Sequence, residues 1–294
     1  MTNIGILGFG EAGSAFARVL AGQGAVVWAF DKAWSESASG LPLTDDAGEH
    51  SIRFCSLGDL LATADIVLST VTTDAALDAA RACVADLRAH QYYCDLNSTA
   101  PTIKVELDGL IGPTGAMFVE GAILGAIGVT GGRTRILLGG VHAEALSGTL
   151  NKFGLESSVY SKEIGKASTF KMLRSIFSKG MEALVIELLL AGRKAGLEDD
   201  LWQEITALFT RNNFDDVARN WVCSHAVAHE RRFHEMAQVA DLLAQMSLDA
   251  IMTDATLAFF RRSNDLKLSR NFTSKPGQMN EVIEALMRRM PAQS

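Results

Sequence analysis

The chain has 294 residues, which is the length of about two domains at roughly 150 residues per domain. Apolar residues make up 48% and charged residues 21%, and this composition excludes global disorder because it can fill a sizeable core. The 27 basic and 34 acidic side chains give a net charge of −7, which argues against a nucleic-acid-binding protein with the usual basic surface.

The first half of the chain alternates strand and helix patterns. Short β-rich runs predict strands at 3–7, 25–30, 51–55, 66–71, 92–96, 116–119 and 134–138. Helical patterns between them predict helices at 12–21, 57–62, 74–88, 101–110 and 143–153. This alternation is typical of βαβ units, so we predict an α/β fold in which residues 1–161 form a doubly wound, mainly parallel Rossmann sheet.

After about residue 161 the strand signal disappears, and residues 162–294 are predicted to form an all-α C-terminal domain. One helical pattern over 166–194 is apolar on nearly all sides in its second half, so it must be buried in this domain or at a subunit interface. Further helices are predicted at 199–210, 214–223, 226–246, 248–262 and 279–290. The first 160 residues carry nine basic and 17 acidic side chains, and the rest carry 18 and 17, which also fits two domains.

The strongest motif is the glycine turn Gly8-Phe9-Gly10-Glu11-Ala12-Gly13, which follows the first strand and opens the first helix. Glycines so placed allow a tight turn, close approach of a pyrophosphate and close packing of helix on strand, while the helix N-terminus presents N–H donors to phosphates. Asp31 ends the second strand, where a carboxylate accepts hydrogen bonds from the adenosine ribose. We therefore predict a dinucleotide site, the alternative being an ordinary turn with a solvated Asp31.

Asp31 would repel a 2′-phosphate, so NAD is predicted in preference to NADP, although the neighbouring Lys32 weakens that preference. The residues assigned to cofactor binding are Gly8, Phe9, Gly10, Glu11, Ala12, Gly13, Asp31, Lys32, Val71, Thr72 and Asn97.

Two further segments follow predicted strands. Residues 95–101 (DLNSTAP) follow the fifth strand, and ligands of doubly wound sheets bind outside the carboxyl ends of the strands. Ser98 or Thr99 can instead serve as the N-cap of the helix that Pro101 favours. Residues 120–126 (EGAILGA) follow the sixth strand, and they either expose backbone N–H groups to an anionic ligand or form a flexible loop.

Ser168, Lys171, Ser175 and Ser178 recur at helical spacing and make one polar stripe on the long apolar helix. Lysines within helices are usually solvated. Because this helix is too apolar to be exposed all round, we expect partial burial to lower the pKa of Lys171, together with the helix dipole and the charges of Lys166, Arg174 and Lys179. A lysine with a lowered pKa can exchange a proton with a substrate hydroxyl.

Together these motifs resemble the β-hydroxyacid dehydrogenase superfamily, which includes 6-phosphogluconate and 3-hydroxyisobutyrate dehydrogenases. The resemblance covers about residues 3–262, and residues 225–262 look like the helical domain of a poorly characterised phosphogluconate-dehydrogenase-like branch. It implies that Lys171 is the general acid–base, and that Ser98, Gly121, Ala122, Ile123, Gly125 and Ser175 bind the substrate.

The chain departs from the superfamily pattern at several positions. In the lysine motif, Ala167 replaces a glycine and Ser175 an asparagine; in the substrate loop, Leu124 replaces a serine and Ala126 a glycine. The loop has lost a hydroxyl and gained apolar bulk, which favours a bulkier or less polar substrate than 6-phosphogluconate.

Three histidines on one predicted helical stretch raise the question of a metal. His225 and His229 share a helix face and His234 follows, but no H-E-x-x-H pattern or cysteine pair accompanies them. We therefore predict no metal and interpret them as surface histidines.

The sequence thus predicts an NAD-dependent dehydrogenase that acts on a CH–OH group of a hydroxy acid or related alcohol. The alternatives are an imine reductase-like oxidoreductase and a dinucleotide-binding sensor without turnover. The apolar helix at 166–194 and the resemblance favour a homodimer. The four cysteines have no C-x-x-C spacing, the N-terminus lacks signal-peptide features, and the apolar stretch 181–191 is too short to cross a bilayer, so we expect a soluble cytoplasmic protein without membrane partners.

Overall fold

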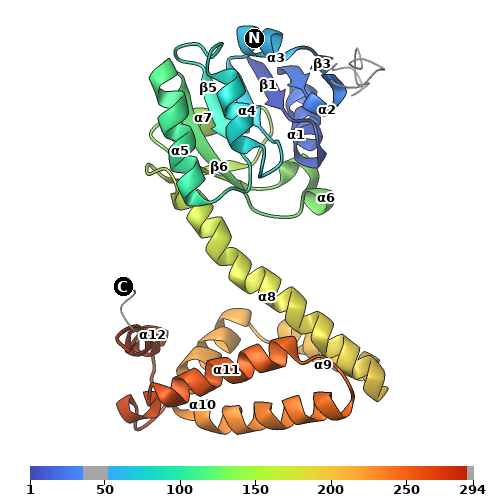
Figure 1. The fold of residues 1–294 in the computed structure, drawn as a ribbon, viewed down its shortest axis with the longest axis vertical. Coiled ribbons are helices and arrows are strands. Elements are labelled where there is room, and N and C mark those ends of the chain that lie inside the picture. Colours follow the sequence, from blue (N-terminus) through green and yellow to red (C-terminus); the bar gives the residue numbers. More distant parts are fainter. Residues whose placement is uncertain (36–51, 290–294) are drawn as a thin grey trace. The chain divides into compact units, whose positions relative to one another are not determined.

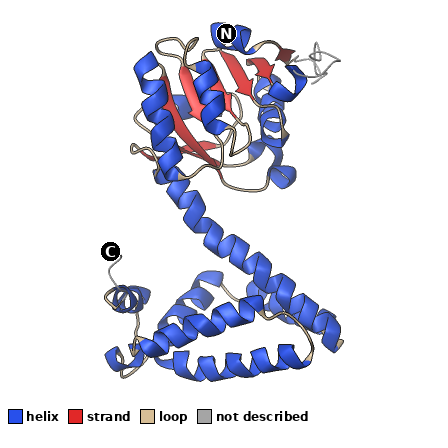
Figure 2. Ribbon diagram, in the orientation of Figure 1, coloured by secondary structure: helices blue, strands red, loops and turns tan. Residues whose placement is uncertain are grey.

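The computed structural model describes residues 1–35 and 52–289. The chain divides into two compact units, Met1–Ile176 and Phe177–Ser294. Figures 1 and 2 show the α/β unit at the N-terminal end and the helical unit that follows it. Ser51 and Met290, each at one end of a predicted element, lie outside the described residues.

Unit 1 is built on a sheet whose described strands run in the order β3-β2-β1-β4-β5-β6-β7-β8. The strands are β1 (Asn3–Leu7), β2 (Val26–Phe30), β3 (Arg53–Phe54), β4 (Ile66–Ser69), β5 (Tyr92–Asp95), β6 (Met117–Ile123), β7 (Ile136–Gly139) and β8 (Ser157–Ser161). Neighbouring strands are parallel except β6 and β7, which pair antiparallel with Glu120 opposite Gly139. The predicted doubly wound, mainly parallel sheet is therefore confirmed.

Helices cover the sheet on both sides because the strand residues alternate between two cores. Ile66 and Leu68 of β4 face a core shared with α1 (Glu11–Gly22) and α7 (Ala143–Lys152). Val67, between them, faces a core shared with α3 (Leu57–Thr63), α4 (Ala76–Cys83) and α5 (Pro101–Ile111). This period of two along a fully buried strand is what a sheet covered on both faces requires.

Short elements complete unit 1. They are α2 (Lys32–Ser35), α6 (Ile127–Thr130) and the 3₁₀ turns η1 (Gly112–Thr114) and η2 (Gly131–Arg133). Helix α8 (Lys166–Ala195) begins in unit 1 and ends in unit 2.

Unit 2 contains the remainder of α8, α9 (Glu198–Arg211), α10 (Phe214–Gln245), α11 (Ile251–Asp265), η3 (Leu268–Asn271) and α12 (Met279–Met287). No strand is found in its described part, as the sequence predicted. Glu187 of α8 caps α11, because its carboxylate accepts hydrogen bonds from the Met252 and Thr253 N–H groups at 2.7 and 2.8 Å.

The structure corrects several predicted elements. Strand β8 was not predicted, and α10 is one helix where two were predicted, at 214–223 and 226–246. Strand β6 continues through Gly121, Ala122 and Ile123, so half of the predicted substrate loop is strand. Helix α4 is shorter than the predicted helix at 74–88.

Candidate active site

The turn between β1 and α1 is tightly packed around two of its glycines. Gly8 has φ +92°, in the left-handed region, and a Cβ there would lie 2.8 Å from the Thr70 carbonyl oxygen. A Cβ on Gly13 would lie 2.1 Å from the Gly8 carbonyl oxygen, so α1 packs directly onto the turn. A Cβ on Gly10, by contrast, would meet nothing within 4 Å. The open space at Gly10, at the N-terminus of α1, is where a phosphate of a dinucleotide fits.

Asp31, just after β2, is oriented by the backbone rather than left to solvent. Its Oδ2 accepts a hydrogen bond from the Phe9 N–H at 2.7 Å and its Oδ1 accepts one from the Ala33 N–H at 2.9 Å. The half-buried carboxylate is thereby fixed next to the glycine turn, with lone pairs left for a ribose hydroxyl.

A cavity of about 810 Å³ opens at this end of the sheet. It is lined by Leu7, Gly8, Gly10, Glu11, Phe30, Asp31, Lys32, Leu57, Thr70, Val71, Thr72, Ala75, Asp78, Ala79 and Ala82. The set includes seven of the residues predicted to bind the cofactor. Phe9, Ala12 and Gly13 belong to the turn without lining the cavity, and Asn97 lies at a second hollow.

This second hollow, of about 120 Å³, lies at the ends of β5 and β6 and the start of α8. Its lining residues are Asn97, Ser98, Thr99, Gly121, Ala122, Ser168, Lys171, Met172 and Ser175. The structure thus brings together five of the residues predicted for catalysis and substrate binding: Lys171, Ser98, Gly121, Ala122 and Ser175. Ile123 does not join them, since it packs in the core on one face of the sheet, and Gly125 lies outside the hollow on an exposed turn.

Lys171 is half-buried, and its Nζ donates a hydrogen bond to Ser98 Oγ at 2.5 Å. Burial of the side chain and, second, the charge of Lys104 lower the pKa of the Lys171 amine below its usual range. The prediction had the direction right and named both partial burial and like charges as causes, but it placed the like charges wrongly. Desolvation dominates, and the like charge comes from α5 rather than from the neighbours Lys166, Arg174 and Lys179.

Below the hollow lies a buried ion pair that the sequence analysis missed. Lys104 of α5 and Asp95 of β5 are both fully buried, and the Lys104 ammonium contacts the Asp95 carboxylate. The other oxygen of Asp95 accepts a hydrogen bond from Asn97 Nδ2. Lysine is almost never fully buried without such a partner.

A second buried carboxylate, Glu120 of β6, holds the start of α8. Its Oε1 accepts a hydrogen bond from the Ala167 N–H at 3.0 Å and its Oε2 accepts one from Ser168 Oγ at 2.6 Å. Gly139 on the neighbouring strand leaves room for this side chain, since a Cβ there would be 2.5 Å from Glu120 Oε1. Glu120 therefore fixes the helix on which Lys171 lies, one turn further on.

The cavity and the hollow lie at the same edge of the sheet. The carboxyl ends of the adjacent parallel strands β1, β4 and β5 supply both, and Asn97 Nδ2 donates a hydrogen bond to Ser69 Oγ, at the end of β4, at 3.0 Å. Within the described residues, Asn97 Oδ1 and Thr99 Oγ1 are buried without a hydrogen-bond partner. Buried polar atoms are normally paired, so these two atoms at the hollow are suited to a ligand.

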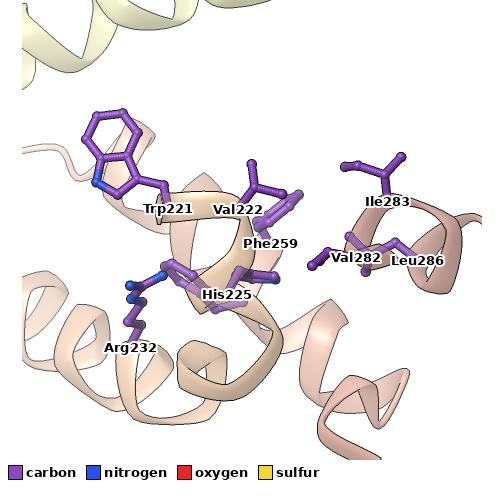
Figure 3. A pocket seen from close by; sticks show the side chains of 9 residues that line it. Trp221, Val222, His225, Arg232, Phe259, Val282, Ile283 and Leu286 are labelled. Atoms are coloured by element: carbon purple, nitrogen blue, oxygen red, sulfur yellow. The ribbon is translucent and has the colours of Figure 1, made fainter. Parts of the chain in front are cut away.

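Unit 2 has its own hollow, of about 470 Å³, between α10, α11 and α12 (Figure 3). Its lining is apolar apart from His225 and Arg232, and consists of Trp221, Val222, His225, Arg232, Phe259, Phe260, Val282, Ile283 and Leu286. Burial, together with His229 and Arg232, lowers the pKa of His225 to about 4. The ring is therefore neutral near pH 7.

The interpretation of the histidines as surface residues is wrong for two of the three. His225 and His229 are 7% and 1% exposed, and only His234 is exposed. His225 Nε2 lies 2.8 Å from Ser263 Oγ of α11, so this ring joins α10 to α11. His229 Nδ1 lies 2.9 Å from the His225 carbonyl oxygen, within α10. In the part of the chain that the structure describes, no three His, Cys, Asp or Glu side chains are grouped to hold a metal ion.

No helix in residues 1–35 and 52–289 has the length and apolar content needed to cross a membrane.

Two family models each match a part of the chain. Residues 1–80 match the NAD-binding domain of the D-isomer specific 2-hydroxyacid dehydrogenases. Residues 193–263 match the domain of unknown function DUF1932. An uncharacterised 28.5 kDa protein of Methanothermus fervidus is 30% identical over 203 residues, which are 69% of this chain and 77% of that protein.

Among solved structures, a conserved protein of unknown function described as similar to 3-hydroxyacid dehydrogenases is 31% identical, with a TM-score of 0.56. The match covers 91% of this chain and 98% of that protein. A conserved hypothetical protein from Sinorhizobium meliloti 1021 is 28% identical over 99% of this chain and 97% of its own, with a TM-score of 0.60. The fold is also that of an imine reductase variant from Myxococcus stipitatus in complex with NAD+, which is 17% identical over 98% and 99% of the two chains, with a TM-score of 0.76.

Proposed function

The chain belongs to the β-hydroxyacid dehydrogenase superfamily, and from this membership we propose that it is an NAD-dependent dehydrogenase with Lys171 as its general acid–base. The substrate is a hydroxy acid or a related alcohol. The observation that carries the proposal is the contact of Lys171 Nζ with Ser98 Oγ in a hollow at the same sheet edge as the glycine turn.

The cavity at Gly8–Gly13 suits a nicotinamide dinucleotide. When bound, this cofactor would take the hydride from the substrate or give it. Gly10 and the first N–H groups of α1 would hold the pyrophosphate, and Asp31 would accept hydrogen bonds from the adenosine ribose. The fixed carboxylate disfavours a 2′-phosphate, so NAD is proposed over NADP. Lys32, which also lines the cavity, tempers that preference.

Lys171 handles the proton of the substrate hydroxyl. In oxidation its neutral amine accepts that proton, and in reduction its ammonium returns it to the oxygen of the carbonyl. The lowered pKa makes the neutral form available closer to physiological pH. Ser98 accepts a hydrogen bond from Nζ and so positions the amine at the hollow.

The walls of the hollow indicate what kind of substrate fits. Ser98, Ser175 and the backbone at Gly121 and Ala122 offer polar contacts on one side. Leu124 does not line the hollow itself but packs with Ala122, which does, and with Leu137 and Ala167; the superfamily has a serine at this position. We therefore propose a substrate that is less polar than 6-phosphogluconate.

We further propose that residues 1–161 form the dinucleotide-binding domain and 162–294 the domain for substrate and dimerisation. Apolar side chains on α8 are exposed in the single chain, among them Leu173, Ile176 and Phe177, which supports a homodimer. The four cysteines are free, which supports a reducing, cytoplasmic location.

The proposal is tested by turnover. The purified protein is assayed with NAD+ and NADP+ against a panel of 2- and 3-hydroxy acids, aryl- and alkyl-substituted hydroxy acids and simple alcohols, and with NADH and NADPH against cyclic imines. NAD+-dependent oxidation of a hydroxy acid or alcohol is expected. In the unsubstituted protein the dissociation constant for NADPH should exceed that for NADH, and Asp31→Ala is expected to bring the two constants closer together. Turnover of imines alone would identify an imine reductase, and dinucleotide binding without any turnover would identify a sensor.

A further inference from the structure

A second lysine, Lys104, lies beneath the Lys171 hollow. It comes from the first turns of α5, has 0% exposure, and makes its contacts inside the sheet edge rather than in the hollow. A fully buried ammonium group is tolerated only when hydrogen-bond acceptors or a counter-charge surround it. The acceptors of Lys104 therefore identify the segments that it joins.

The contacts of Lys104 join the segments that carry the site. Besides the Asp95 carboxylate, Nζ donates to the carbonyl oxygens of Asp95 at 2.9 Å, Asn97 at 2.8 Å and Gly121 at 3.3 Å. The first two belong to the end of β5 and its turn, and the third to β6. We propose that Lys104 is a positioning residue of the site, which ties the turn bearing Asn97 and Ser98 to β6 and fixes a positive charge beneath Lys171.

The ion pair also decides which way the amide of Asn97 faces. Asp95, held by Lys104, is a carboxylate that only accepts hydrogen bonds, so it faces the Nδ2 donor of Asn97. Asn97 Oδ1 is consequently left as the unpaired atom at the hollow. The unpaired atom of Asn97 is thus a hydrogen-bond acceptor, and a ligand that offers an N–H or O–H group complements it.

The charge of Lys104 acts on Lys171 through this turn. The two ammonium groups hold adjacent residues, since Lys104 bonds to the Asn97 carbonyl oxygen and Lys171 to Ser98 Oγ. Two carboxylates lie nearby, but Asp95 is paired with Lys104, and Glu120 accepts hydrogen bonds from Ser168 and Ala167. On its own helix, Lys171 has Lys166 and Arg174, which are both exposed. The repulsion from Lys104 is consistent with the lowered pKa of Lys171.

The inference rests on the proposed role of Lys171, but its test needs no substrate. Acetic anhydride in trace amounts acetylates only neutral amines, so the pH at which Lys171 is half-maximally labelled can be followed by mass spectrometry between pH 6.5 and 11. Exposed lysines in the same sample, such as Lys179, serve as internal references. Lys104→Gln removes the charge and keeps hydrogen-bond donors. Lys166→Gln removes an exposed lysine five residues before Lys171 and is the matched control.

In Lys104→Gln, half-labelling of Lys171 is expected to move to higher pH, while Lys166→Gln is expected to leave it in place. Lys104→Arg retains the positive charge, so half-labelling of Lys171 is expected at the same pH as in the unsubstituted protein. Circular dichroism melting identifies the variants that fold, and Lys104→Met replaces Lys104→Gln if that variant does not. Unchanged labelling of Lys171 in a folded variant that lacks the Lys104 charge would overturn the inference. Loss of the fold in both such variants would also overturn it, because Lys104 would then be required for folding of the whole domain. A negative substrate panel would reject the proposed function and leave this result intact.

Discussion

At the residue scale, the surroundings of Lys171 make this helical lysine a candidate general base. The hydrogen bond to Ser98 and the desolvation of the amine are both consequences of where α8 starts, which Glu120 fixes. Sequence reasoning selected Lys171 by its spacing and by a family resemblance, but nothing in the sequence marks Lys104 as buried. A lysine four positions into an amphipathic helix is normally a surface residue, and only the fold shows the carbonyl groups that surround it.

Lys171→Ala is expected to reduce turnover by about 10²–10⁴-fold, the usual contribution of a general acid–base, or roughly 3–5 kcal/mol of barrier. Lys171→Arg is expected to be nearly as damaging, because a guanidinium stays protonated near neutral pH. The dissociation constant for NADH should hardly change, since the glycine turn is untouched. Steady-state kinetics with the substrate from the panel, with Lys166→Ala as control, provide the measurement. Near-normal turnover in Lys171→Ala would mean that the base lies elsewhere.

At the element scale, the alternation of strands and helices in unit 1 was predictable because buried strands and amphipathic helices leave strong periodic patterns. Strand β8 escaped because its sequence, SSVYS, is too polar to resemble a strand. The break predicted near Ser224 does not exist, since residues 214–245 contain neither glycine nor proline and His225 is held against α11.

The glycine turn supplies a prediction that separates folding from binding. Gly13→Ala places a Cβ 2.1 Å from a backbone oxygen, so we expect a loss of about 1–3 kcal/mol in the free energy of unfolding. Gly10→Ala meets nothing within 4 Å, so the protein should fold normally but bind NADH more weakly, because the methyl group takes the space of the pyrophosphate. Thermal melting and NADH fluorescence titration distinguish the two. Full NADH affinity in Gly10→Ala would mean that the pyrophosphate does not bind at this turn.

The contact between α10 and α11 predicts a pH dependence. His225 has a pKa of about 4 when folded and an ordinary value near 6.5 when unfolded, so the unfolded chain binds the extra proton between these values. Stability should therefore fall as the pH falls from about 6.5 to 4, by about 3 kcal/mol from this group. Urea unfolding followed by circular dichroism at several pH values measures the effect. His225→Gln should remove most of it, whereas His234→Gln, which replaces an exposed histidine of the same helix, should not.

At the scale of the whole molecule, the two-unit organisation was predictable from the loss of strand patterns after residue 161. The burial of His225 and His229 was not predictable from the sequence, because charged residues surround them along the chain and suggest an exposed helix.

The proposed homodimer leads to a prediction about α8. Ile176 is 72% exposed in the single chain, and a glutamate there would place a charge in an apolar interface. Ile176→Glu is therefore expected to shift the protein toward monomer in light scattering at micromolar concentration. Val141→Glu is the control, because Val141 is equally exposed at 72% but is not a residue of α8. A monomer for the unsubstituted protein would contradict the proposal.

The polar strand β8 also bears on how the sheet avoids unwanted growth. It is the last strand of the described sheet, its middle residues are exposed, and its register with β7 shifts at Leu138 and Gly139. An edge strand with free N–H and C=O groups is a template for another chain, and an irregular register or a very short strand discourages such pairing. At the opposite edge, β3 has only two residues. Both edges of the described sheet are thus poor templates for strand addition, which agrees with a proposed dimer that forms through the exposed apolar side chains of α8 instead.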